Sequence, residues 1–157
     1  IDGLDRLINN AGVLVEGERF GQLDAETMAH SVRVNTIGPV LMAQAFSDLL
    51  VRGQSARIAN ISSGLGSISC VDGFHSPSYN ASKAALNMWT RLLAHALNPL
   101  GVLCFALRPG WVRTDMGGAD APLSVEVSVA GMIEQLEQAG PDDQAVLLGY
   151  DGSRTDW

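Results

Sequence analysis

The stretch Ser78–Leu86, SYNASKAAL, contains the only lysine of the chain, Lys83, four residues after Tyr79, one of two tyrosines. On a helix, residues four apart lie on the same face, so the ammonium would approach the phenol. A nearby positive charge favours the phenolate and lowers the tyrosine pKa toward the range where it exchanges protons at neutral pH. An isolated pair of this kind is more often a surface tyrosine beside a solvated lysine, so its meaning depends on partners elsewhere.

A candidate partner lies upstream, where the apolar run Ile58–Ile61 is typical of a short buried strand. The strand ends in Ser62-Ser63-Gly64, a sequence typical of a turn. Open α/β sheets bind ligands at the carboxyl ends of their strands, so the Ser63 hydroxyl is a candidate to hydrogen-bond a substrate oxygen. Taken alone, a serine at this position more often only stabilises a turn by hydrogen-bonding the backbone.

Strand-like and helix-like segments alternate along the chain. The predicted strands are Leu4–Asn9, Ile58–Ile61, Val102–Leu107 and Ala145–Leu148, and the predicted helices are Asp24–Gly53, Tyr79–Leu97 and Ser124–Leu136. This alternation predicts an α/β fold with a parallel sheet. Gly38-Pro39 predicts a distortion within the first helix, because proline lacks an N–H and crowds the carbonyl four residues back.

Composition narrows the class of protein. With 157 residues, 46% of them hydrophobic and 17% charged, the chain can build one core around a buried sheet. A net charge of −7 with a single lysine leaves no basic patch for a phosphate backbone, so we expect no nucleic-acid partner. No apolar run reaches the roughly 18 residues of a membrane helix, so we expect no membrane span. The histidines, His30, His75 and His95, have no metal-ligand spacing, and we expect no metal.

Five motifs follow one another in an order that resembles the short-chain dehydrogenase/reductase family, over nearly the whole chain. They are Asn9-Asn10-Ala11-Gly12, Asn35 within Arg33–Thr36, Ser63 after a strand, the Tyr79 and Lys83 pair, and Pro109-Gly110 followed by Thr114. Softer patterns resemble the branch that contains the sniffer-type carbonyl reductases and the C-factor signalling proteins. These are Gly64-Leu65-Gly66, the run Pro109–Gly118, and the closing Asp151-Gly152 with Trp157.

The resemblance implies a doubly wound parallel sheet of Rossmann type, of which residues 1–157 form one partial domain. The glycine-rich turn that receives the pyrophosphate in this family does not occur in the sequence. Leu4–Ile8 resembles the fourth strand of the family. We therefore expect the C-terminal portion of the fold only, preceded in the family by a half of about 80 residues. The fragment alone is expected to be inactive.

The resemblance also implies an NAD(P)-dependent oxidoreductase that moves a hydride between a nicotinamide and a carbonyl or alcohol carbon. Tyr79 would exchange the proton, and Ser63 would hydrogen-bond the same oxygen. Lys83 would lower the tyrosine pKa and bind the nicotinamide ribose, and Asn35 would hold a water that relays protons. In the alternative for Asn35, it is a polar residue on an exposed helix face.

Further cofactor contacts are implied by the family motifs. Asn10, Ala11 and Gly12 would line the adenosine-side ribose and the backbone path; Pro109, Gly110, Val112 and Thr114 would line the carboxamide and pyrophosphate. The cofactor would be NADP or NAD, with NADP slightly favoured. Two other classes stay open: a non-catalytic binding or signalling protein on this fold, and an isomerase or lyase of the wider superfamily.

Three segments have less certain roles. Phe74 and His75 lie in a long loop and are either substrate-facing or ordinary loop residues. Small and apolar residues recur at helical spacing in the second helix, at Ala81, Ala85, Met88, Leu92 and Ala96, as in a core or a subunit interface. Gly117–Pro122 would be a mobile lid. The resemblance to the family also implies a cytoplasmic protein that forms a homo-oligomer and acts on a small-molecule carbonyl or alcohol.

Overall fold

A five-stranded sheet in the order β1-β2-β3-β4-β5 forms the centre of the computed structural model, which describes residues 1–157. The strands are β1 Arg6–Asn9, β2 Arg57–Ile61, β3 Leu103–Arg108, β4 Leu147–Gly149 and β5 Arg154–Thr155. β1 to β4 are parallel and β5 is antiparallel to β4. The expectation of a parallel α/β sheet is confirmed, and the short β5 is an edge strand that the sequence analysis missed.

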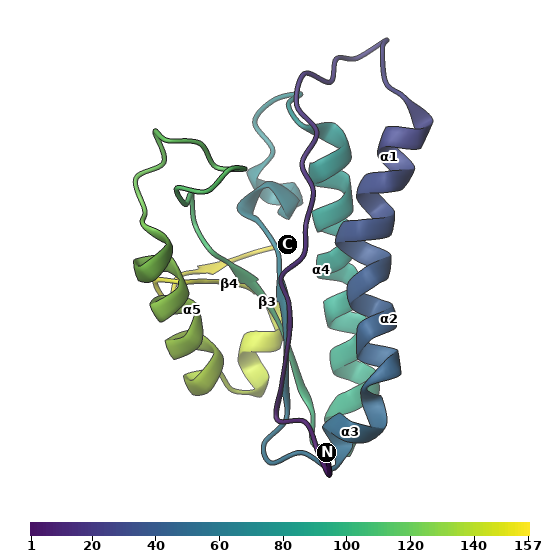
Figure 1. The fold of residues 1–157 in the computed structure, drawn as a ribbon, viewed down its shortest axis with the longest axis vertical. Helices are drawn as coiled ribbons and strands as arrows, with labels where there is room; N and C mark the ends of the chain where they lie inside the picture. Colours follow the sequence, from purple (N-terminus) through teal and green to yellow (C-terminus); the bar gives the residue numbers. More distant parts are fainter.

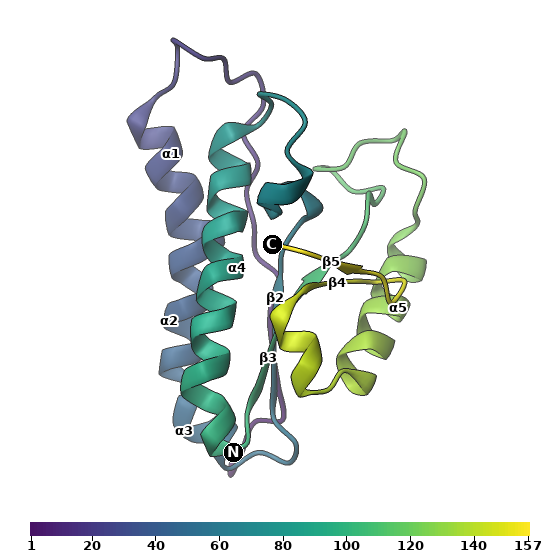
Figure 2. The same ribbon diagram turned by 180° about the vertical axis from the view of Figure 1, so that it is seen from behind.

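Helices cover both faces of the sheet unequally (Figure 1). They are α1 Ala25–Val32, α2 Gly38–Ala45, α3 Ser47–Val51, α4 Pro77–Leu97 and α5 Val125–Gln138. Figure 1 shows α1, α2 and α4 side by side on one face, with α5 alone on the other. Viewed from behind, α4 runs along most of the length of the molecule, beginning at the end where the parallel strands finish (Figure 2).

The predicted helix Asp24–Gly53 forms, but it is not continuous. Asp24 caps its start by accepting a hydrogen bond of 2.8 Å from the Thr27 N–H. A turn of π-helix at Arg33–Ile37 separates α1 from α2, directly before Gly38-Pro39. The distortion that proline predicts is therefore present, and Asn35 lies inside it.

Two apolar clusters pack against opposite faces of the sheet. Leu7, Ile58 and Cys104 pack beneath α2, α3 and α4 together with Leu50 and Ala94. Phe105, Leu107 and Leu148 pack on the other face with Leu136 of α5. Successive residues of a strand point to opposite faces, which is why Ile58 and Ala59 belong to different clusters.

The apolar stripe of α4 does not lie in the core. Met88 is 62% exposed and Leu92 is 48% exposed. The buried side of the helix carries Ser82, Leu86 and Thr90 instead. The interpretation of the stripe as core is wrong, because the sheet side of α4 is built around polar residues, and the stripe is left as an exposed apolar face.

None of the helices combines the length and the apolar character that crossing a membrane requires.

Candidate active site

The sequence motifs converge at the carboxyl ends of the parallel strands. Asn10 follows β1, Ser63 follows β2 and Pro109 follows β3, while Tyr79 lies in the first turn of α4. This is the end of the sheet at the top of Figure 1, where the loops gather. Parallel topology places these four segments together although they are spread over a hundred residues of sequence.

Tyr79, Lys83 and Ser63 meet at this edge. The Lys83 ammonium lies 5.6 Å from the centre of the Tyr79 ring. It donates a 2.7 Å hydrogen bond to the carbonyl of Ile61, the last residue of β2, and the side chain is only 4% exposed. The Ser63 hydroxyl lies close enough to the Tyr79 phenol to act on its pKa, and it accepts a 3.2 Å hydrogen bond from the Leu65 N–H. A phenol, an ammonium and a hydroxyl therefore share one corner of the structure.

The electrostatics of this corner differ from the sequence expectation. Burial raises the pKa of the Tyr79 phenol, although the hydrogen bond with Ser63 acts in the opposite direction. Burial also lowers the pKa of Lys83 to about 8. The predicted lowering of the tyrosine pKa by the lysine is wrong here, because desolvation outweighs other influences on the phenol. Consequently, the phenol is protonated at neutral pH and has a proton to donate.

Two glycines lie against Lys83, and the close packing at one of them, Gly66, has no room for a side chain. A Cβ at Gly66 would come within 2.7 Å of the Lys83 Cβ, closer than side chains tolerate. A Cβ at Gly12 would lie 3.6 Å from the Lys83 ammonium and 3.5 Å from the Asn35 side-chain oxygen. Gly66 lets the turn after β2 rest directly on α4. Gly12 brings the segment after β1 close to the lysine.

Asn35 is fully buried, so its interpretation as an exposed helix residue is wrong. Its side chain forms a pair of 2.8 Å hydrogen bonds with the backbone of Val13, accepting from the N–H and donating to the carbonyl. The same amide nitrogen lies 2.9 Å from the Ser82 hydroxyl, to which it donates. Asn35 thus holds the segment after β1 against α4. A role in holding water stays a prediction.

A layer of buried amides and hydroxyls beneath the site was not predicted. The Asn9 amide donates to the Asn60 side-chain oxygen at 2.8 Å, and the Asn60 amide donates to the Thr90 hydroxyl at 2.8 Å. The Ser62 hydroxyl donates to the Asn87 side-chain oxygen at 2.5 Å. An asparagine in the middle of an apolar strand was the available signal, since a buried amide needs partners on the neighbouring elements.

The loop after β3 is tightly folded. The Pro109 carbonyl accepts a 2.7 Å hydrogen bond from Ser128 of α5. Gly110 has a φ of +80°, and a Cβ there would approach Leu123 to 2.5 Å. Thr114 accepts a 3.1 Å hydrogen bond from the Gly117 N–H. The predicted lid segment, residues 117–122, therefore belongs to a loop with its own hydrogen bonds.

The loop before α4 and the C-terminal residues complete the rim. Phe74 packs edge-on against Phe20, with ring centres 5.8 Å apart, and His75 lies 3.9 Å from the Asp72 carboxylate. The Ser67 hydroxyl donates a 2.6 Å hydrogen bond to the Asp156 carbonyl. This last contact, which links the chain end to the loop after β2, carried no signal in the sequence.

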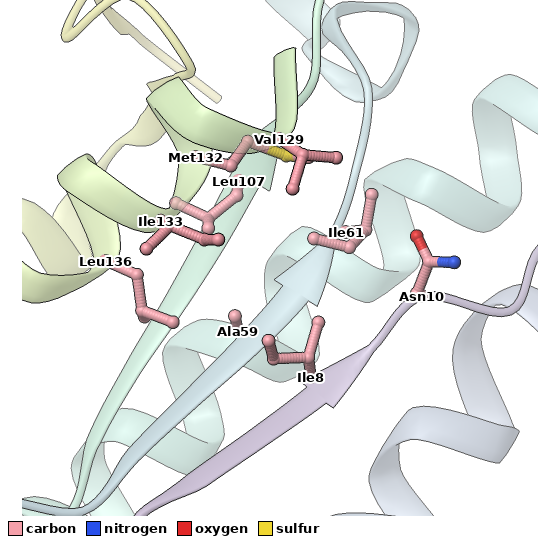
Figure 3. Close-up of a pocket in the computed structure, with 9 residues that line it drawn as sticks. All are labelled: Ile8, Asn10, Ala59, Ile61, Leu107, Val129, Met132, Ile133 and Leu136. Carbon is pink, nitrogen blue, oxygen red and sulfur yellow. The ribbon is translucent and has the colours of Figure 1, made fainter. Parts of the chain in front are cut away.

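A groove lies on the face of the sheet that packs against α5, opposite to the face covered by α4. It has a volume of about 250 Å³, and all but one of its lining residues are apolar. Figure 3 shows Ile8 and Ile61 of the strands facing Val129 and Ile133 of α5 across it. Asn10 stands at the rim nearest the site. β1 is an edge strand of the sheet: it pairs with β2 on one side and with no strand on the other.

Comparison with known proteins agrees with this arrangement. The family model for short chain dehydrogenases matches residues 1–122. The chain belongs to the short-chain dehydrogenase/reductase family. It is 36% identical to the C-signal of Myxococcus xanthus over 154 residues, covering 98% of this chain and 93% of that relative. It is also 36% identical to the short-chain dehydrogenase RED3 of Pyricularia oryzae, of which it covers 60%.

Solved structures extend the similarity to the fold. Carbonyl reductase Sniffer of D. melanogaster has a TM-score of 0.95 and 33% identity, and NADPH-bound carbonyl reductase from chicken fatty liver has 0.93 and 36%. Each match covers 99% of this chain and 67% of the other chain. The resemblance to the family, its Rossmann-like fold and the sniffer-type neighbours is confirmed. Apart from C-signal, the chain spans about two thirds or less of the relatives named here.

Proposed function

We propose that this chain carries the catalytic half of an NAD(P)-dependent oxidoreductase acting on a carbonyl or alcohol. The supporting observation is the meeting of Tyr79, Lys83 and Ser63 at the carboxyl ends of the parallel strands, in the order that the family uses. The cofactor proposed is NADP or NAD, since the carbonyl reductase from chicken fatty liver is an NADPH-bound member of the same fold. The substrate is a small molecule.

In this proposal Tyr79 and Ser63 act on the same oxygen atom of the substrate. When bound, the nicotinamide supplies or accepts the hydride at the neighbouring carbon. In the direction of reduction, the Tyr79 O–H gives its proton to that oxygen as the hydride arrives, and the phenol is protonated at neutral pH because burial raises its pKa. Ser63 hydrogen-bonds the same oxygen and stabilises its developing charge. Asn35 positions the water that returns a proton.

The residues of this chain fit the nicotinamide end of the cofactor better than its pyrophosphate. Lys83, with its buried ammonium, and the loop residues Pro109, Gly110, Val112 and Thr114 would hold the nicotinamide end. Asn10, Ala11 and Gly12 would line the path beside the adenosine-side ribose, where Gly12 leaves room next to Lys83. A glycine-rich turn for the pyrophosphate does not occur in the sequence.

We assign the open edge of β1 and the groove beside α5 to packing against a phosphate-binding βα unit of the family. Ile8 is 52% exposed on β1 and Ile133 is 53% exposed on α5, although parallel sheets are covered on both faces. A strand added at β1 and a helix laid over the groove would bury both residues. Residues 1–157 are thus proposed to be one part of a Rossmann-like domain. The exposed face of α4 around Met88 and Leu92 is proposed to pair with a second copy.

The decisive experiment is Tyr79→Phe in this chain joined to the phosphate-binding half of a family member. Without the donor proton, kcat for carbonyl reduction should fall roughly 10²- to 10⁴-fold. NADPH affinity, measured by titration calorimetry, should stay the same, because only a hydroxyl has been removed. Tyr150→Phe is the matched control and should keep its turnover. Near-normal turnover in Tyr79→Phe would end the proton-donor assignment.

A binding measurement on residues 1–157 alone tests the proposal that the pyrophosphate is held by another part of the domain. Without a glycine-rich turn we expect no measurable binding of NADP by titration calorimetry. Micromolar affinity would contradict this expectation and would place the pyrophosphate on residues of this chain.

A second candidate is a non-catalytic binding or signalling role, favoured by the match to C-signal over 93% of that relative. Carbonyl reduction by the joined protein would argue against it. An isomerase or lyase, the third class, would hold its cofactor through a full cycle and show no net consumption of NADPH.

A further inference from the structure

Helix α4, which carries Tyr79 and Lys83, is not capped at its N-terminus by a side chain of its own N-cap residue. Its N-cap residue, Ser76, has a φ of +44° and makes no side-chain hydrogen bond to the helix. By contrast, α1 and α5 are capped by the side chains of Asp24 and Ser124. A long helix that begins without a cap leaves N–H groups of its first turn in need of acceptors.

A carboxylate from a distant loop supplies the missing cap. The Ser78 N–H donates a 3.2 Å hydrogen bond to one oxygen of Glu18, and the Ser78 hydroxyl donates a short hydrogen bond to the other. Glu18 stands 60 residues earlier, in the segment between β1 and α1. A negative charge at this position is also favoured by the partial positive charge of a helix N-terminus. Ser78 is only 2% exposed, so the contact is partly shielded from water.

The segment that carries Glu18, residues 10–24, is fastened at two further points. Val13 forms two backbone hydrogen bonds with the Asn35 side chain, and Phe20 packs against Phe74 in the loop before α4. Figures 1 and 2 show this segment rising past the carboxyl ends of the strands toward the start of α4. The attachment at Glu18 is the one that holds the residue directly before Tyr79.

We propose that Glu18 is a positioning residue that fixes the first turn of α4 and thereby the Tyr79 phenol. The proposal rests on the proposed function only for what the phenol does. The geometric statement, that a carboxylate in the loop after β1 sets the place of Tyr79, stands on the two hydrogen bonds to Ser78. Glu18 itself touches no reacting atom.

The test uses the 157-residue chain with Tyr150→Phe, so that Tyr79 is the only tyrosine and its phenol is titrated by ultraviolet absorbance. Into this background go Glu18→Ala, and Glu18→Gln, which keeps one acceptor oxygen. Asp24→Ala is the matched control, because the Asp24 carboxylate caps α1 by accepting from an N–H and a hydroxyl, as Glu18 does at α4. Amide hydrogen exchange is followed at Ser78, whose N–H is bound to Glu18, and at Asn80, whose N–H is bound to the Ser76 carbonyl.

In Glu18→Ala we expect amide exchange at Ser78 and Asn80 to accelerate roughly fivefold to tenfold, the usual effect of a lost cap. The phenol titration should move down toward the ordinary tyrosine value, because burial is what raises the pKa of Tyr79 and a loosened first turn exposes the phenol to water. Glu18→Gln should show a smaller change of the same sign. Asp24→Ala should lower overall stability and leave the phenol titration in place.

Two results would overturn the proposal. One is an unchanged phenol titration and exchange pattern in Glu18→Ala; the other is an equal shift caused by Asp24→Ala. Neither readout requires activity, so the proposal fails separately from the proposed function. In the joined protein, the same variant should lower kcat for carbonyl reduction and leave the NADPH affinity unchanged.

Discussion

The two faces of the sheet differ in how completely their side chains find partners within the chain. The face toward α4 carries Asn9, Asn60 and Ser62, and each side chain finds a hydrogen-bond partner within the chain. The face toward α5 is apolar, and Ile8 and Ile133 remain about half exposed there. Both faces belong to the same strands, because alternate residues of each strand point in opposite directions.

This difference shows where the catalytic geometry is determined. Lys83 is held by the Ile61 carbonyl, and its approach to β2 rests on the amide layer between strands and α4. Ile61 takes part in the first contact through its backbone carbonyl, whereas its side chain lines the groove on the other face. The proposed proton-transfer corner can therefore form within this chain, whereas the α5 face leaves apolar surface to be covered. Polar contacts need specific partners, while apolar burial depends mainly on area.

The largest expected effect concerns the burial of Lys83 on the polar face. Its pKa is lowered by desolvation from 10.5 to about 8, so between these pH values the unfolded chain holds a proton that the folded chain lacks. Stability rises with pH wherever the unfolded state binds more protons. We expect this lysine to contribute an increase of up to about 3 kcal/mol in the free energy of unfolding from pH 7 to above pH 10.

The measurement is urea unfolding at pH 7 and pH 10 for the native chain and for Lys83→Met. The difference between the two proteins isolates the lysine, since alkaline losses from Cys104, whose pKa burial raises to about 12, occur in both. As the only lysine, Lys83 also gives a single ¹³Cε signal in NMR. A titration midpoint near 10.5 would show that the side chain is not buried as described.

A smaller effect is expected from the amide layer. Asn60→Leu keeps the size of the side chain but removes the hydrogen bonds to Asn9 and Thr90. It also leaves the Asn9 amide with only a 3.4 Å contact to the Pro39 carbonyl. We expect a loss of about 2 kcal/mol in the free energy of unfolding. Thr90→Val, which removes one partner only, should cost less, and an Asn60→Leu protein as stable as the native chain would show that this layer is not structural.

Sequence patterns predicted the strands and helices on the α4 face of the sheet better than the side-chain contacts between them. The parallel strands and the helix with Tyr79 follow from periodicity, and the break near Asn35 follows from Gly38-Pro39. The position of Ser63 follows from its place at a strand end. These features depend on residues close together in the sequence.

Other features depend on long-range packing and could not be read from local patterns. The raised pKa of Tyr79 comes from burial, which no spacing reveals. The α4 stripe at Met88 and Leu92 has ideal helical spacing, yet the sheet selects the neighbouring polar stripe instead. The cap from Glu18 joins loops 60 residues apart. In each case the outcome depends on a tertiary contact that the local sequence pattern does not contain.

The smallest expected effect lies on the α5 face. Ile8→Gln and Ile133→Gln should each change the free energy of unfolding of this chain by about 1 kcal/mol or less, because half of each side chain is already in water. Leu136→Ala, at a buried position of the same groove, should cost about 3 kcal/mol and serves as the reference.

Joining the phosphate-binding half should raise the cost of both substitutions at the exposed pair. If a helix covers the groove, Ile8→Gln and Ile133→Gln would each cost about 2 kcal/mol or more in the joined protein, since a polar amide would then be buried without a partner. Equal costs in both proteins would mean that the added half does not pack on this groove. Such a result would separate the open β1 edge from the apolar face beside it, and the groove would need another occupant.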